Sequence, residues 1–169
     1  LESCDALQLQ HNEAEFTLYA EIRGDVAIHD GDSLGFRDAD GRYRIFEIFT
    51  RTLRQPDNIW IIDGIDKGVF ELMGDPVEEK RARDTSVNDY VGRLLEGTRF
   101  TLVSTASGTG TVTAYYESVW SALVKVQEVY GVRCVPYYTI TGGLVTGRYL
   151  SVDPAGTVNR GRIFELGDD

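Results

Sequence analysis

The clearest periodic pattern in the sequence runs from Ser118 to Tyr130. Apolar residues recur there at the 3.6-residue spacing of an α-helix, and polar residues occupy the opposite side. Ser118 is suited to cap the amino terminus of this helix, and Gly131 can adopt the left-handed conformation that ends it. The predicted apolar face consists of Val119, Leu123, Val126 and Tyr130, and the polar face of Ser121, Lys125 and Glu128.

Two apolar, aromatic-rich runs follow this helix directly. They span Val132 to Thr141 and Leu144 to Val152, and Gly142-Gly143 separates them. Adjacent glycines tolerate the positive φ angles of a tight hairpin turn, and β-branched and aromatic residues suit strands. The sequence therefore predicts a helix that leads into a β-hairpin.

The first half of the chain carries strand patterns. From Ala14 to Ile22, apolar and polar residues alternate with period two, which is typical of a strand with one face in water. Asp and Gly residues between the runs predict turns, because Asp side chains close local turns and Gly adopts positive φ. The further strands predicted for this antiparallel meander are Leu34 to Phe36, Arg42 to Thr52 and Ile59 to Ile62.

A change of composition separates this half from the next. Charged residues fill the stretch from Glu78 to Asp84, which we interpret as a solvated linker and the boundary between two lobes. The stretch from Ser104 to Thr113 is rich in Gly, Ser and Thr, so we expect a mobile loop there.

A second helix is predicted after the charged stretch. Ser86 is placed to cap it, Gly97 to end it, and four apolar residues lie on one face. Short strands are expected at Phe100 to Val103 and Gly161 to Leu166. The apolar face of the second helix consists of Val87, Val91, Leu94 and Leu95.

The composition is acidic. The chain has 169 residues, 42% of them hydrophobic and 26% charged, with a formal net charge of -10 and a pI near 4.7. Phosphate backbones would be repelled by this charge, so we expect no tight nucleic-acid binding. No apolar run approaches the roughly 20 residues of a membrane helix, and no basic-then-apolar leader opens the chain, so we expect neither membrane insertion nor secretion. Because the first residue is Leu1 rather than Met, we expect a piece of a longer protein.

No constellation of residues points to catalysis, to a cofactor or to a metal, and we predict no site of these kinds. Cys4 and Cys134 lie far apart in strand-like surroundings, which favours buried thiols and leaves a disulfide open. His11 and His29 have no His or Cys companion at a ligand spacing.

Weaker motifs have structural explanations. The glycine cluster from Ser107 to Gly110 lacks the Lys of a phosphate-binding loop, and no Gly-x-Ser-x-Gly turn occurs. A carboxylate pair for glycoside hydrolysis stays open, because such pairs meet in space. Trp60, Trp120 and the tyrosines suit core packing first and a sugar- or partner-binding surface second. Four aspartates do not match a calcium loop and are interpreted as turn residues: Asp30, Asp32, Asp38 and Asp40.

The order of short motifs along nearly the whole chain resembles the amino-terminal hub region of phage and prophage tail-tip proteins. This family is often labelled prophage tail endopeptidase or tail-associated lysin. The motifs that carry the resemblance are Asp5-Ala6-Leu7 with the strand from Glu13 to Ile22, Tyr43 to Ile48, Ser86 to Leu95, Ser118 to Leu123, Gly147 to Leu150 and Arg160 to Gly167.

The resemblance implies a trimeric ring of β-barrel-like domains at the tail tip, below the tail tube. Its partners would be distal tail and tail tube proteins, and any peptidoglycan-cutting activity would belong to domains after this region. We accordingly expect an α+β fold with a mostly antiparallel, barrel-like hub lobe at residues 1–77, completed by a returning strand near 160–169. A smaller inserted lobe with two helices is expected at residues 78–152.

The function expected from this resemblance is structural and non-enzymatic. The protein would be made in the bacterial cytoplasm and would lie at the tail tip of a virion. A cell-wall-degrading enzyme and a host-surface carbohydrate-binding module are the alternatives.

Overall fold

A computed structural model describes residues 4–11, 16–23, 27–29, 31–38 and 40–156 of the chain. Most of its strands belong to one eight-stranded sheet. These strands are β1 (Cys4–His11), β2 (Phe16–Arg23), β3 (Ser33–Arg37), β4 (Tyr43–Arg54), β5 (Ile59–Asp66), β7 (Thr101–Ser104), β9 (Val132–Thr141) and β10 (Leu144–Pro154). A two-stranded ribbon consists of β6 (Pro76–Ser86) and β8 (Thr109–Ser118), and the helices are α1 (Lys67–Gly74), α2 (Val87–Leu95) and α3 (Val119–Tyr130).

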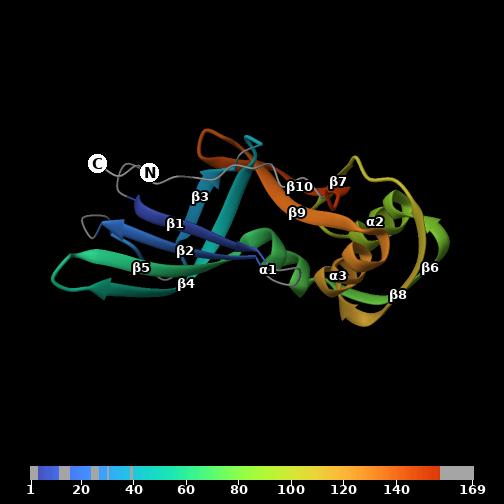
Figure 1. Cartoon of the computed structure of the whole chain (residues 1–169), viewed down its shortest axis with the longest axis horizontal. Helices are drawn as coiled ribbons and strands as arrows, with labels where there is room; N and C mark the ends of the chain where they lie inside the picture. Colours follow the sequence, from blue (N-terminus) through green and yellow to red (C-terminus); the bar gives the residue numbers. More distant parts are fainter. Residues whose placement is uncertain (1–3, 12–15, 24–26, 30, 39, 157–169) are drawn as a thin grey trace.

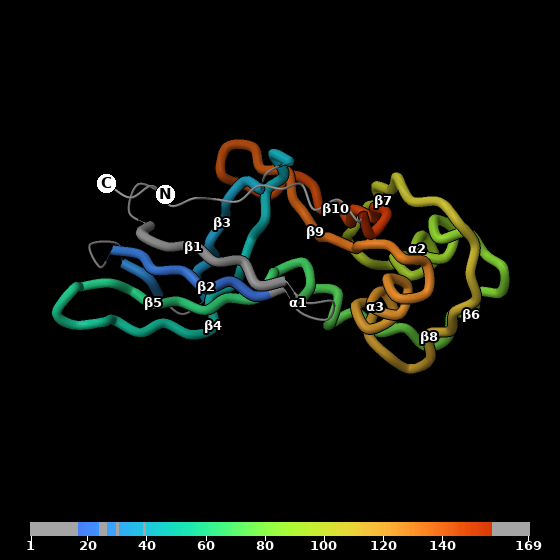
Figure 2. Tube along the Cα trace, in the orientation of Figure 1, coloured from blue at the N-terminus to red at the C-terminus, as the bar shows by residue number. Residues whose placement is uncertain are grey.

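The molecule is elongated, with strands at one end and helices at the other. Figure 1 shows β1, β2 and β5 toward one end, α2, α3 and the β6–β8 ribbon at the other, and α1 between them. The strand order is β1-β2-β5-β4-β9-β10-β7, with β3 beside β4, and all neighbours are antiparallel except β10 and β7. The chain trace in Figure 2 shows how the late strand β9 runs from the helical end toward the early strand β4, after which β10 turns back toward the helical end.

The α+β class predicted from the sequence is confirmed, but the barrel is not. Within the described part of the chain, β1 and β7 stand at opposite ends of the strand order, and the sheet does not close on itself. The described residues form three helices where two were predicted, and the additional helix, α1, follows β5 without an intervening loop. The predicted returning strand near residues 160–169 lies outside the described residues.

The predicted hairpin is confirmed. Strands β9 and β10 pair antiparallel, and Gly142 and Gly143 take φ angles of 59° and 79° in the turn. Both central residues therefore have the positive φ that matches the twist of the flanking strands. A register shift between Val145 and Gly147 follows, where the ring of Tyr149 covers the open face of Gly147.

Both predicted helices are confirmed, α3 at both ends and α2 at its amino-terminal cap, while α2 ends at Leu95, two residues before the predicted Gly97. Ser118 accepts a hydrogen bond from the amide of Ser121 at 3.1 Å, and Gly131 ends α3 with a φ of 61°. Ser86 accepts from the amide of Asp89 at 3.1 Å and caps α2 in the same way.

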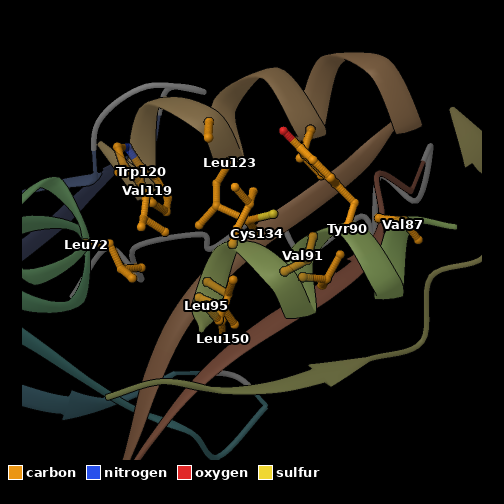
Figure 3. Close-up of a cluster of buried hydrophobic side chains, with 14 of the residues drawn as sticks. Leu72, Val87, Tyr90, Val91, Leu95, Val119, Trp120, Leu123, Cys134 and Leu150 are labelled. Carbon is orange, nitrogen blue, oxygen red and sulfur yellow. The ribbon is translucent and has the colours of Figure 1, made fainter. Parts of the chain in front are cut away.

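The larger core lies between the three helices and the strands β9 and β10. Figure 3 shows side chains from α1, α2 and α3 gathering beside Cys134 and Leu150. Val69 and Leu72 of α1 belong to this core, although they precede the predicted lobe boundary. The largest fully buried side chains here are Trp120, Tyr90, Leu72, Leu94, Leu123, Leu150 and Val69.

A smaller core lies at the strand-rich end. The alternation predicted for the strand around Ala20 places its apolar residues there, because every second residue of β2 points to the same face. Its buried members are Ala20, Ile22, Ile28, Ile48 and Ile62.

The charged stretch from Glu78 to Asp84 is not a linker, and that prediction is wrong. It forms most of β6, which pairs antiparallel with β8 from Pro76↔Ser118 to Ser86↔Thr109. Val77 and Ala82 are buried, while all the charged residues of the strand except Lys80 are exposed. The loop predicted from Ser104 to Thr113 is correspondingly short, because β8 begins at Thr109.

We expect Leu123→Ala to lower the free energy of unfolding by about 2 to 5 kcal/mol, since Leu123 is fully buried and its truncation leaves a cavity. Lys125→Ala, on the solvent side of the same helix, removes only a surface ion pair with Glu117 and should cost less than about 1 kcal/mol. Denaturant midpoints measure both. Equal losses would show that the buried face of α3 is assigned wrongly.

Candidate functional site

A buried ion pair attaches the amino-terminal end of α1 to the main sheet. Arg44 of β4 donates from Nε and Nη2 to Oδ2 of Asp66, at 3.1 and 2.5 Å. The other carboxylate oxygen accepts from the amides of Gly68 and Val69, at 2.8 and 3.1 Å. The side chains of Arg44 and Asp66 are only 3% and 0% exposed. One carboxylate therefore neutralises a buried arginine and caps a helix.

The surroundings of Asp66 act on its pKa in opposite directions. Burial raises the pKa of the carboxyl group, because charge is less stable away from water. The Arg44 guanidinium and the two helix amides oppose this effect by favouring the ionised form. The charge of Asp66 therefore depends on Arg44.

Two further contacts orient α1. Gly68 lies so close to Pro136 of β9 that a Cβ at this position would overlap the proline ring. Glu71 accepts a hydrogen bond from Nε of Arg148 in β10 at 3.2 Å. With these residues facing the sheet, Phe70 and Met73 lie on the outer side of the helix, 55% and 47% exposed.

A groove of about 380 Å³ lies where the carboxyl end of α1 meets the end of the β6–β8 ribbon, and we call it the α1–β8 groove. Tyr115 and Tyr116 extend the apolar surface beside it and are 60% and 74% exposed. Large apolar side chains gathered at the surface mark sites of partner binding. The groove is lined by Met73, Gly74, Pro76, Val77, Glu78, Tyr116, Glu117 and Ser118.

Tyr116 lines this groove in an unusual backbone conformation. Its φ of 45° lies in the left-handed region, which bulky residues rarely occupy. Glu117 stabilises the turn, because its Oε1 accepts from the amide of Tyr115 at 3.1 Å and from Nζ of Lys125 at 2.7 Å. Strain of this kind persists only where surrounding contacts impose it, and it concentrates at functional sites.

The electrostatics of the groove are simple. Glu117 is neutralised by Lys125, and the Ser118 hydroxyl caps α3. Glu78 is exposed, and it forms no ion pair with any residue that the structure describes. The groove thus offers an apolar floor with one carboxylate at its edge, which suits the binding of side chains from another molecule.

The cysteine, histidine and aspartate candidates from the sequence do not line the α1–β8 groove, as far as the structure describes them. Cys134 is a free thiol in the larger core, and burial raises its pKa to about 12. The buried thiol predicted for Cys134 is therefore confirmed, while the side chain of Cys4 lies outside the described ones. His29 is exposed and lies 3.5 Å from the carboxylate of Asp32, whereas the side chain of His11 is not among those described.

Asp32 and Asp38 close local turns, as predicted, and Oδ2 of Asp32 accepts from the amide of His29 at 2.7 Å. Oδ1 of Asp38 accepts from the amides of Asp40 and Arg42, both at 2.9 Å. Asp30 lies outside the described residues. No group of three or more His, Cys, Asp or Glu residues that would hold a metal ion occurs among residues 17–156 as described.

The aromatic residues divide between core and surface. Trp120 is buried in the larger core, and Trp60 is half-buried beside the smaller one. The exposed pair Tyr115 and Tyr116 was missed by sequence reasoning, which expected a loop up to Thr113 and assigned no site here. The available signal was two adjacent tyrosines just before the helix cap at Ser118. No helix among the described residues has the length and apolar character needed to cross a bilayer.

No protein-family model matches the chain, and no curated protein matches it in sequence. Its fold is nevertheless similar to that of two crystallised tail proteins. The prophage tail protein gp18 from Listeria monocytogenes EGD-e superimposes with a TM-score of 0.59 at 10% identity, over 91% of this chain and 46% of that one. The tail protein from Neisseria meningitidis MC58 superimposes with a TM-score of 0.50 at 16% identity, over 82% of this chain and 42% of that one. This chain therefore spans less than half the length of either protein, and the likeness is one of fold.

We expect Asp66→Asn to destabilise the protein by about 3 to 5 kcal/mol, because it removes the counter-charge that Asp66 gives the buried Arg44 while keeping the shape of the side chain. Glu96→Gln makes the same chemical change in the exposed pair with Lys80 and should cost less than about 1 kcal/mol. Equilibrium denaturation measures both variants. A loss for Asp66→Asn as small as that for Glu96→Gln would contradict an ionised Asp66 beside Arg44.

Proposed function

We propose that this chain is a structural component of a phage or prophage tail and forms part of the hub ring below the tail tube. The observation that carries this proposal is the fold likeness to a prophage tail protein over 91% of the chain. A second tail protein shares the fold over 82% of the chain. The order of sequence motifs, which resembles the tail-tip hub family, supports the same function independently of the fold.

The proposal extends to assembly and location. The chain would form a homotrimer and contact distal tail and tail tube proteins. It would be made in the bacterial cytoplasm and would become part of the virion tail tip. We retain the division into a hub lobe at residues 1–77, completed near 160–169, and a second lobe at 78–152 as part of this proposal.

The acidic charge is consistent with a passage for DNA. A basic lumen would hold a passing duplex through the release of counterions, whereas an acidic lumen repels it. The net charge of -10 is consistent with an acidic lumen, and we propose that the chain binds no nucleic acid tightly.

We also propose that this region is not an enzyme. The α1–β8 groove has an apolar floor, and its Ser118 hydroxyl is engaged in capping α3 rather than paired with a base. The family resemblance assigns peptidoglycan cutting to domains beyond this region.

Negative-stain microscopy of the full-length protein tests the assembly. We expect ring-shaped particles with threefold symmetry, and gold-labelled antibody against this region at the tail tip of virions. Labelling along the tail tube or on the capsid would contradict the proposed position, and isolated monomers at micromolar concentration would contradict the trimer.

Incubation with purified peptidoglycan tests the absence of catalysis. We expect residues 1–169 to release no soluble fragments, because the region supplies structure rather than chemistry. A muramidase in a parallel reaction shows that the substrate is cleavable. Release by the pure protein above the level of a heat-denatured sample would favour the cell-wall-degrading alternative.

A further inference from the structure

We infer that the α1–β8 groove binds a short segment of another protein in which an aliphatic or aromatic side chain stands next to a lysine or arginine. The inference goes beyond the proposed function, because it assigns a binding surface and the chemistry of its ligand. It does not depend on whether the chain forms a hub ring.

The size and lining of the groove select an apolar side chain. Its volume of about 380 Å³ lies near the lower end of the roughly 300 to 1,000 Å³ typical of ligand pockets, which leaves room for one or two side chains. Met73 and Tyr116 lie at its edges with 47% and 74% of their surface exposed. Removing such apolar surface from water favours association.

The charge of the groove selects a cation beside that side chain. Glu117 is already neutralised by Lys125, which leaves Glu78 as the exposed carboxylate of the lining. No lysine or arginine belongs to the lining residues. A basic residue that follows or precedes the buried side chain would therefore pair with Glu78.

The same charges disfavour a second copy of this chain as the occupant. Among the large aliphatic side chains that the structure describes, Leu144 at the tip of the β9–β10 hairpin is the most exposed, at 72%. Residues 141–146 around it are Thr, Gly, Leu and Val, so the tip offers no cation to Glu78.

The groove is held in shape before any ligand arrives. The Arg44–Asp66 pair and the Gly68–Pro136 contact fix α1, and the hydrogen bonds of Glu117 hold Tyr116 in its left-handed conformation. A preformed surface loses little conformational entropy on binding. A short segment therefore suffices as a ligand.

One methyl group reports directly on the groove. Met73 is the only methionine of the chain, so labelling with [methyl-13C]methionine gives a single signal from the groove of residues 1–169. The probe is a fluorescein-labelled peptide, Gly-Lys-Leu-Lys-Leu-Lys-Gly. We expect it to bind by fluorescence anisotropy and, without the dye, to shift the Met73 signal. Replacing its lysines by glutamate, or its leucines by serine, should weaken binding about tenfold or more.

Variants separate specific binding from general attraction to an acidic protein. Tyr116→Asn removes the ring but keeps a residue that tolerates positive φ, and Glu78→Lys reverses the groove charge. We expect each to weaken binding about fivefold or more, with thermal unfolding unchanged within a few degrees. Glu128→Lys makes the same charge change on the exposed side of α3 and should leave the affinity within about twofold.

Several results would overturn the inference. These are no binding, equal binding of the glutamate peptide, or equal weakening by Glu128→Lys and Glu78→Lys. A Met73 signal that moves with protein concentration alone would assign the groove to a second copy. A signal that moves in Phe164→Ser without peptide would assign it to the chain's own Arg162-Ile163-Phe164 segment.

Discussion

The ion pair between Arg44 and Asp66 is the constraint on which the arrangement of the molecule depends. Strand β5 ends at Asp66 and helix α1 begins at the next residue, so no loop absorbs the change of direction. The carboxylate must satisfy the first amides of the helix and the guanidinium of a neighbouring strand together. Because α1 leads directly into β6, the same pair also sets the position of Met73 and of the groove beside it. A buried charge pair stabilises only modestly in net terms, but the loss of one partner is costly, and this asymmetry fixes the geometry.

The elements that sequence reasoning found are those whose determinants are local. Ser118 and Gly131 bound α3 from within one turn of its ends, and Gly142-Gly143 specify their own hairpin turn. Helix α1 was not predicted, because the interactions that specify it are not local. It is short, contains glycines at both ends, and is capped by a residue of a strand whose partner, Arg44, lies 22 residues earlier. Strand β6 escaped for a similar reason, since its charged sequence gains strand character only from pairing with the distant β8.

The α1–β8 groove could not be predicted from the sequence. Its lining comes from two segments, residues 73–78 and 116–118, that only the folded chain brings together. The conformation of Tyr116 depends on Glu117, which is positioned in turn by Lys125 on the following helix. The open sheet could not be predicted either, because closure into a barrel depends on pairing between the two end strands and not on the pattern within any one strand.

The join between the early and late strands has a mechanical consequence. Among the described residues, β4 and β9 pair at one position, Tyr43↔Tyr138. In contrast, β4 pairs with β5, and β9 pairs with β10, along most of their length. Mechanically, the long sheet consists of two stiff parts, β1-β2-β5-β4 and β9-β10-β7, joined by one short contact. A tensile load along the long axis would separate β4 from β9 before the strands within either part slid past one another. The resistance to that load would come mainly from side chains that cross this contact, such as Arg42, which bonds to Ser151 and pairs with Asp153 of β10.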